Sequence, residues 1–322
     1  MDIRVLTSAD DLATWASFVE KSPQGSLWQS KEWKAYQETL GRHTRVYGAF
    51  SGHDMAACAL VTIDRTAGNL ATWEIPRGPI GEGAAELATR VANDAKTEKA
   101  LILRLSPAAP LPLDGFGPSD GHSQPEATRI LDLTLDDDAL LAQMKPKGRY
   151  NIRLAQRHDI EARDGDVGAF HALLKRTGAR DGFGIHPERH YRAFLEHVPG
   201  AFLLLAYHPR TSETEPVAGL LGVVWGTTGI YYYGASDERH RALMAPYVLQ
   251  WEAMHRCKAA GATRYDLLGV APEGSDEKHA WAGITNFKEK FGGTLISYPQ
   301  ERQRVLRPLA WNTLKLKRRI LG

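Results

Sequence analysis

The sequence predicts an α/β (α+β) protein built from two copies of one structural unit. The chain has 322 residues, which exceeds the usual size of a single hydrophobic core. With 43% hydrophobic and 24% charged residues, it has the composition of an ordinary globular protein. Helical and strand-like patterns also follow one another in the same order in both halves, which is typical of a tandem repeat.

In the first half, the expected order is helix, helix, hairpin, loop, helix and strand. Ser8 or Asp10 is a suitable cap for the first helix. Gly52 and Asp54 stand where the hairpin needs a tight reversal. We expect these elements at residues 9–20, 31–39, 44–50 with 55–63, 75–83, 84–96 and 100–105.

The second half repeats this order. We expect it at residues 168–177, 188–197, 201–208 with 217–225, 230–235, 247–260 and 264–268, followed by a strand at 294–298 and a basic helix at 309–320. The order resembles the acetyltransferase (GNAT) fold, so tandem GNAT-like domains are expected. We expect the first domain at 1–143, completed by the helical segment 303–322, and the second at 144–302.

Cysteine content and hydropathy indicate the compartment. Cys58 and Cys257 are the only cysteines, which excludes a disulfide framework and suits a reducing cytoplasm. The first 20 residues have no signal-peptide pattern, and apolar runs such as 218–226 are too short to span a bilayer. We therefore expect a cytoplasmic protein, with a peripheral contact to the inner face of the plasma membrane still allowed.

Two stretches of the chain are strongly basic. Residues 145–157 hold five cations and no acid, and residues 302–322 hold seven and no acid. Arg149, Arg153 and Arg157 are spaced to share one helix face. Such stretches indicate a polyanionic partner, nucleic acid or phosphorylated lipid, and the alternative is a solvated helix face with a soluble tail.

Several common chemistries are excluded by missing motifs. There is no P-loop, no dinucleotide fingerprint, no zincin motif and no nucleophile elbow. His186 and His190 are four residues apart without a third ligand nearby, so no metal is expected. The approach to the helix at 247 lacks glycine, and Pro246 lacks an N–H, which disfavours pyrophosphate binding and hence acetyl-CoA. No cofactor is expected.

Four motifs in the second half carry a resemblance to a known family. They are YYYGAS at 231–236, APYVLQW at 245–251, YDLLG at 265–269 and NFKEKFGG at 286–293. Earlier pieces agree: SPQG at 22–25 before Trp33, RGP at 77–79, LR at 103–104 before Pro107, and KGRYNIR at 147–153. Over nearly its whole length the chain resembles the Fem (FemABX) family of peptidoglycan interpeptide-bridge aminoacyltransferases, in the compact form without the helical-hairpin insertion.

The resemblance implies a reaction and its partners. An amino acid is expected to pass from aminoacyl-tRNA to an amine of the stem peptide of a peptidoglycan precursor, UDP-linked or lipid-linked, on a monomeric enzyme. Aminolysis of an ester needs a neutral amine against the ester carbon and positive charge where the oxyanion develops. The resemblance implies that Lys288 supplies this charge with Phe287 beside it. The alternative is that Lys288 is a surface lysine on an exposed turn.

The resemblance also implies binding residues. Substrate contacts are expected at Lys34, Arg77, His186, Tyr191, Tyr231, Tyr233 and Tyr247. Apart from the resemblance, the charge pattern predicts contacts with phosphates of tRNA or of a lipid at Lys147, Arg149, Arg153 and Arg157. Lys315, Arg318 and Arg319 in the basic tail are expected to bind such phosphates too, or to hold the protein near an anionic membrane.

The chain departs from the family at three positions. Ser106 stands where some members carry a carboxylate, His186 stands where an arginine precedes proline, and Lys34 is only near an expected phosphate-binding lysine. The acceptor therefore stays open. The alternatives are a tRNA-dependent ligase acting on a non-cell-wall acceptor and a non-catalytic polyanion-binding protein on the same scaffold.

Overall fold

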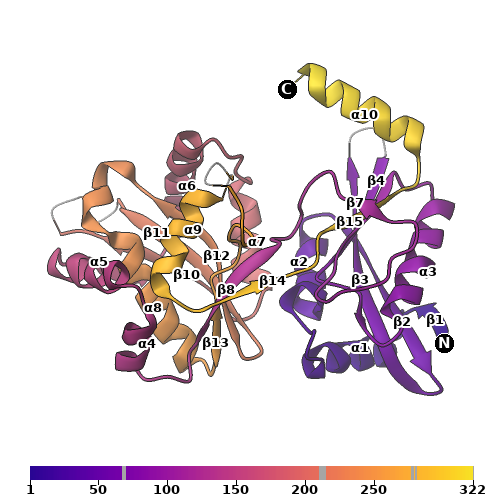
Figure 1. Ribbon diagram of the computed structural model, residues 1–322, viewed down its shortest axis with the longest axis horizontal. Coiled ribbons are helices and arrows are strands. Elements are labelled where there is room, and N and C mark those ends of the chain that lie inside the picture. Colours follow the sequence, from indigo (N-terminus) through magenta and orange to yellow (C-terminus); the bar gives the residue numbers. More distant parts are fainter. Residues whose placement is uncertain (67–69, 210–214, 277–278, 280, 322) are drawn as a thin grey trace. The chain divides into compact units, whose positions relative to one another are not determined.

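A computed structural model of the chain describes residues 1–66, 70–209, 215–276, 279 and 281–321. The chain forms two compact units, Met1–Glu126 with Tyr298–Gly322, and Ala127–Ser297. Residues 127–143 thus lie in the second unit rather than in the first, because their strand β8 (Ala127–Asp132) pairs with β13 and β14 of the second sheet. Each unit combines one sheet with flanking helices (Figure 1).

The first unit has a sheet in the order β1-β2-β3-β4-β6-β15-β7, with β5 paired to β3. Its elements are β1 (Asp2–Val5), α1 (Ala9–Lys21), η1 (Leu27–Gln29), α2 (Lys31–Thr39), β2 (His43–Ser51), β3 (Asp54–Thr66), β4 (Leu70–Pro76), β5 (Ile80–Gly81), α3 (Ala84–Thr97), β6 (Ile102–Ser106), β7 (Gly117–Pro118), β15 (Arg302–Val305) and α10 (Pro308–Leu321). The three expected helices are present, and Ser8 caps α1 by accepting from Asp11 N–H. The strand β4 is present in the structure but was not expected from the sequence.

Helix α3 buries its apolar stripe against one face of this sheet. Leu87 and Val91 pack with Val61, Trp73 and Leu103 in one cluster. Near the C-terminus, α10 adds a smaller cluster in which Trp311 packs against Leu101 and Ile102. Within the described residues, no helix has both the length and the hydropathy needed to cross a membrane.

The second unit has a sheet in the order β14-β8-β13-β12-β11-β10-β9. Its further elements are α4 (Asp137–Gln143), α5 (Pro146–Arg157), β9 (Glu161–Asp164), α6 (Val167–Asp181), α7 (Glu188–His197), β10 (Ala201–Tyr207), β11 (Ala218–Trp225), β12 (Thr228–Ser236), η2 (Glu238–Leu243), α8 (Ala245–Ala259), β13 (Arg264–Asp266), α9 (Ala282–Lys288), η3 (Glu289–Phe291) and β14 (Thr294–Ser297). Its main core lies around α8, which buries Leu249, Ala253, Met254 and Cys257. The expected loop at 209–215 lies largely outside the described residues.

Both units contain the same central connection. A strand leads into a helix and then into a parallel neighbouring strand, as β4–α3–β6 in the first unit and β12–α8–β13 in the second. Parallel strands need such a crossover because one strand finishes at the end of the sheet opposite to where the next strand begins. The expected repeat of one α/β unit is therefore present.

Candidate active site

Lys288 lies where the parallel strands of the second unit separate. The pairing of β12 with β13 ends at Ile230 and Asp266. Beyond this point the Lys288 ammonium nitrogen Nζ donates to the carbonyl oxygens of Leu268 at 3.2 Å and Gly269 at 2.7 Å. Lys288 is only 6% exposed, so the alternative that it is a surface lysine is wrong.

Burial changes the acid–base behaviour of this lysine. Removal from water lowers the pKa of Lys288 to about 7, and the negative charge of Asp266 opposes the shift. The Tyr231 ring centroid lies 5.3 Å from Nζ, and the face of such a ring attracts a cation. At neutral pH the side chain therefore populates both the ammonium and the neutral amine. The ammonium can donate to a developing oxyanion.

Aromatic side chains hold the segment that carries Lys288. The Phe287 ring packs edge-on against Tyr247 at 5.1 Å and Phe291 at 5.2 Å between centroids. Tyr247 belongs to α8, and burial raises the pKa of its hydroxyl. Phe287 therefore connects α9 to the central helix of the unit.

A β-bulge separates two tyrosines that strict alternation would place on one face. Leu221 pairs with Tyr233 but Gly222 pairs with Tyr231, so Tyr232 is the extra residue. Tyr231 packs with the α8 core, whereas Tyr233 contacts Tyr191 of α7 at 5.1 Å between ring centroids. Of the two expected contacts, Tyr231 lies beside Lys288, and Tyr233 belongs to the cluster around α7. The bulge is a tertiary feature that alternation in the sequence does not reveal.

Histidines and tyrosines gather around α7. The rings of His186 and His190 stack at 3.9 Å, and His190 Nε2 is hydrogen-bonded to the Tyr233 hydroxyl at 3.1 Å. Tyr191 is 1% exposed, and its hydroxyl accepts from the His186 N–H at 3.1 Å. Tyr191 therefore stabilises this cluster from within, and only His186 is exposed. Among the described residues, no group of three or more His, Cys, Asp or Glu could hold a metal ion.

In the first unit, Arg77, one of the expected substrate contacts, is buried and bonded within the protein. Arg77 is 3% exposed, donates to the Pro125 carbonyl at 2.7 Å and stacks on the Tyr298 ring at 3.5 Å from its centroid. These contacts fix the loop that carries Arg77 to the chain around Tyr298. A direct contact with substrate would require this packing to open.

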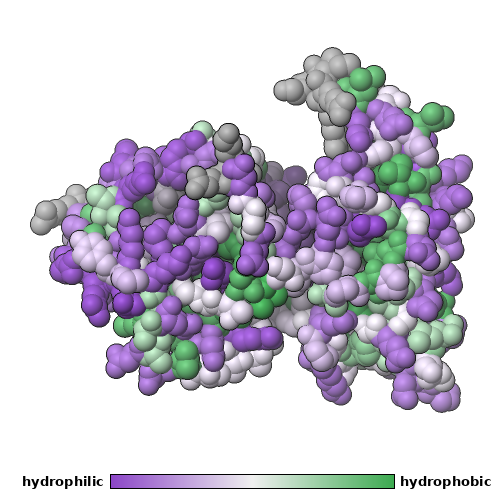
Figure 2. Space-filling view, viewed as in Figure 1, coloured by the Kyte–Doolittle hydropathy of each residue, from purple (hydrophilic) through white to green (hydrophobic). Residues whose placement is uncertain are grey.

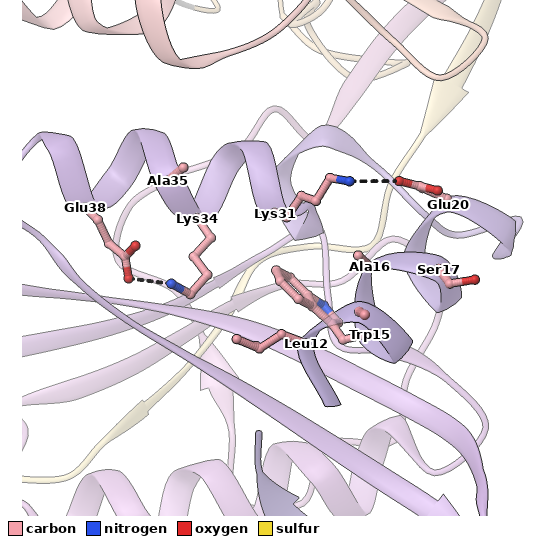
Figure 3. A pocket seen from close by; sticks show the side chains of 10 residues that line it. Leu12, Trp15, Ala16, Ser17, Glu20, Lys31, Lys34, Ala35 and Glu38 are labelled. Atoms are coloured by element: carbon pink, nitrogen blue, oxygen red, sulfur yellow. Dashed lines mark hydrogen bonds and ion pairs between the residues drawn. The ribbon is translucent and has the colours of Figure 1, made fainter. Parts of the chain in front are cut away.

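Lys34 lies on an open pocket of about 530 Å³ between α1 and α2. Figure 3 shows its ammonium paired with Glu38 at 2.7 Å, and Lys31 paired with Glu20 at 3.7 Å. An anionic ligand at Lys34 would compete with Glu38 for the same cation.

The expected cations of α5 are in two different situations. The Arg149 guanidinium donates to the carbonyl oxygens of Met144 and Leu141 at the end of α4, so it caps a helix. Lys147, Arg153 and Arg157 are exposed. In the tail, Lys315 pairs with Asp120 at 3.0 Å, and the side chains of Arg318 and Arg319 lie outside what the structure describes.

Three residues with structural roles in the two units, Asp266, Thr128 and Glu301, were not among the expected site residues. Asp266 and Thr128 support the turn that holds Lys288, and Glu301 gathers serines from distant loops. Of these, only Asp266 stands inside a recognised motif, YDLLG. Thr128 and Glu301 act through contacts more than 130 residues away in sequence, which no local pattern encodes.

The fold defines a class, proteins with tandem acetyltransferase-like domains. Among solved structures, FemX matches with a TM-score of 0.78 at 19% identity, covering 97% of this chain and 99% of that one. A tandem GNAT protein from the clavulanic acid biosynthesis pathway matches with a TM-score of 0.58 at 13% identity, covering 95% and 99%. The expected tandem GNAT fold is thereby confirmed.

The FemAB family model matches residues 11–114, 97–213 and 206–317, so the chain belongs to the FemAB family. Its relatives include the lipid II:glycine glycyltransferases of Staphylococcus saprophyticus and Staphylococcus aureus. Both are 22% identical to this chain, over 87% of it and 88% of the relative. The expected family is confirmed.

Proposed function

We propose that this protein transfers an amino acid from aminoacyl-tRNA to an amine of the stem peptide of a peptidoglycan precursor. The observation that carries the proposal is Lys288, a buried lysine held where two parallel strands separate. Membership of the FemAB family and the lipid II substrate in the names of its glycyltransferase relatives support the acceptor.

In the proposed reaction, the neutral acceptor amine attacks the ester carbonyl carbon of the aminoacyl-tRNA. The new C–N bond forms, and the carbonyl oxygen becomes an oxyanion that the Lys288 ammonium stabilises. Collapse of this intermediate breaks the C–O bond to the terminal ribose. The ribose oxygen takes up the proton that the amine loses. Because the step is an acyl transfer, it needs no external oxidant or reductant.

The outer surface of α5 supports tRNA as the donor. Lys147, Arg153 and Arg157 are exposed there, and cations on one surface attract phosphates. Tyr150 is 55% exposed beside them, with the Arg157 guanidinium 5.8 Å from its ring centroid. Exposed aromatic rings next to cations are suited to stacking with unpaired bases.

Helix α10 supports a peripheral contact with the membrane that carries a lipid-linked acceptor. Leu309 and Leu316 are 86% and 59% exposed, and they are seven residues apart, so they share one face. Most of the surface visible in Figure 2 is hydrophilic, and apolar side chains are visible along α10. An amphipathic helix of this kind lies in the plane of a membrane surface. We propose a protein that works at the inner face of the plasma membrane.

The test is reconstitution with charged tRNAs and two acceptors, UDP-linked and lipid-linked pentapeptide, read by the mass of the acceptor. We expect a gain of one or more amino acids that depends on charged tRNA and not on acetyl-CoA. Lys288→Met is expected to lower kcat by roughly 10²–10³, the usual effect of losing one oxyanion donor. Lys290→Met, a change at the neighbouring lysine, is the control and is expected to retain activity.

Three results would count against this function. Transfer that requires acetyl-CoA would overturn the donor, and full activity in Lys288→Met would overturn the site. Transfer to neither acceptor, with tRNA still bound, would favour a different acceptor or a binding role.

A further inference from the structure

The turn that holds Lys288 is itself held by one carboxylate. Leu268, one of the two residues whose carbonyls accept from Nζ, has a φ of 55°, in the left-handed region that leucine rarely adopts. Asp266 Oδ1 accepts from the Leu268 N–H at 2.7 Å. An aspartate that bonds the backbone two residues ahead is a common way to stabilise such a turn. The conformation of Leu268 therefore depends on Asp266.

A second donor reaches the same oxygen from β8. The Thr128 hydroxyl donates to Asp266 Oδ1 in a short hydrogen bond, and the two residues are 0% and 6% exposed. The turn is also tied to β8 through the backbone, by Leu267 N–H to the Arg129 carbonyl at 2.9 Å and by Val270 N–H to the Ala127 carbonyl at 3.0 Å. If the carboxylate rotated away, the Thr128 hydroxyl and the Leu268 N–H would both lose their acceptor. Loss of a buried acceptor is costly, so the carboxylate is fixed in place.

The negative charge of Asp266 also acts on Lys288 and raises the pKa of its ammonium, against the effect of burial. From β12, Tyr231 presents its ring, and burial raises the pKa of its hydroxyl to about 12, so it is uncharged at neutral pH. Glu289 follows Lys288 directly but pairs with Lys145 at 2.6 Å instead. Among the charged groups of the described residues, Asp266 is therefore the one that favours the ammonium form of Lys288 against the cost of burial.

We propose that Asp266, supported by Thr128, is the positioning residue for Lys288. Its carboxylate fixes the turn whose carbonyls hold Nζ, and its charge keeps an ammonium where the oxyanion of the transfer reaction forms. The inference rests on the proposed function for its catalytic meaning. The coupling between the two side chains can be measured without any substrate.

The measurement is an NMR titration of the full chain with isotope-labelled lysine, which reports the charge of Lys288 directly. Asp266→Asn keeps an oxygen for Thr128 and Leu268 but removes the negative charge. We expect the pKa of Lys288 to fall below its wild-type value of about 7. Transfer should fall about tenfold at pH 8 for each unit of that decrease, and the alkaline limb of the pH–rate profile should move to lower pH.

Thr128→Val removes only the hydroxyl donor. It should increase hydrogen exchange at the Leu268 amide while changing the Lys288 titration less than Asp266→Asn does. The control is Asp132→Asn at the other end of β8, where the carboxylate bonds only Thr134 among the residues described. It should leave the titration, the amide exchange and the pH–rate profile unchanged.

The inference is overturned if Lys288 titrates in Asp266→Asn as it does in the wild type. If that variant does not fold, unchanged Leu268 exchange in Thr128→Val has the same consequence. A shifted titration together with full transfer by Lys288→Met would leave the coupling standing and overturn the proposed function instead. The two failures are therefore distinguishable.

Discussion

The carboxylate of Glu301 accepts a hydrogen bond from the Ser106 hydroxyl at 2.7 Å, across 195 positions of sequence. Ser123 donates to the same oxygen from its hydroxyl at 2.7 Å and its N–H at 2.8 Å, and Ser119 donates to the other oxygen at 2.9 Å. Ser106 is the position at which some family members carry a carboxylate. In this chain the Glu301 carboxylate lies beside Ser106. Because this carboxylate accepts four hydrogen bonds, it holds loops together and is not free to act as a base.

Replacement of Glu301 should destabilise the first unit in a graded way. Glu301→Gln retains two acceptor lone pairs and should cost about 1–2 kcal/mol, because the backbone N–H of Ser123 cannot reorient. Glu301→Ala should cost about 2–3 kcal/mol, because the buried Ser106 hydroxyl and the partly buried bonds from Ser119 and Ser123 all lose their acceptor. Urea denaturation measures both, with Ser119→Ala as a milder control. A loss below about 0.5 kcal/mol for Glu301→Ala would contradict this role.

Gly148 allows α5 to pack against the segment after Lys288. A Cβ at this position would lie 2.2 Å from the Lys290 carbonyl oxygen, which is a backbone atom that cannot swing away. We expect Gly148→Ala to destabilise the second unit by about 1–3 kcal/mol and to lower transfer by displacing η3. Gly283→Ala in α9 is the control, because nothing lies within 4 Å of its added Cβ. Equal effects of the two substitutions would refute the packing argument.

The buried lysine makes stability depend on pH. The pKa of Lys288 is about 7 in the folded chain against an ordinary 10.5. Between these values the unfolded chain binds a proton that the folded chain does not, so stability rises with pH across this window. From pH 7 to pH 9.5 the contribution of this group is about 3 kcal/mol. It disappears below pH 7, where the full cost of burying the charge is present.

Lys288→Met should therefore be more stable than the wild type near pH 7, and the difference should shrink towards pH 9.5. Urea denaturation of both proteins at the two pH values measures this, and their difference cancels the other titrating groups. A constant difference across the window would mean that Lys288 keeps its ordinary pKa when folded.

The exposed ring of Tyr150 should contribute to binding of unpaired nucleotides. Tyr150→Ala is expected to weaken binding of tRNA with its single-stranded 3′ end by about 1–3 kcal/mol, the usual value of one base–aromatic stack. Binding of a blunt RNA duplex should change little. Phe183→Ala removes another exposed ring, 45% exposed, and serves as the control. Fluorescence anisotropy at fixed salt measures the affinity of the wild type and both variants for tRNA and for the duplex. If Tyr150→Ala lowers the affinity for tRNA and for the duplex equally, stacking is excluded.

Much of the architecture follows from local pattern. The helices at 31–39 and 188–197 are present with the expected bounds, because apolar spacing, and at 31–39 the Ser30 cap, act within a few turns. The motif order between 231 and 293 was sufficient to predict the family and to select Lys288. β4 was missed because its residues precede a Gly- and Pro-rich segment, and strand formation there depends on pairing with β3 and β6.

The sequence by itself determined the repeated unit and the family, and it predicted Lys288 as the candidate catalytic residue. Tertiary structure decided the environment of that lysine, because burial, the bulge at Tyr232 and the turn held by Asp266 arise from residues brought together across strands. It also showed that Arg77, Arg149 and Tyr191 make internal contacts, although their side chains are of types that commonly bind ligands. The physical reason is that a side chain's charge and availability depend on its solvation and partners, and long-range contacts set both.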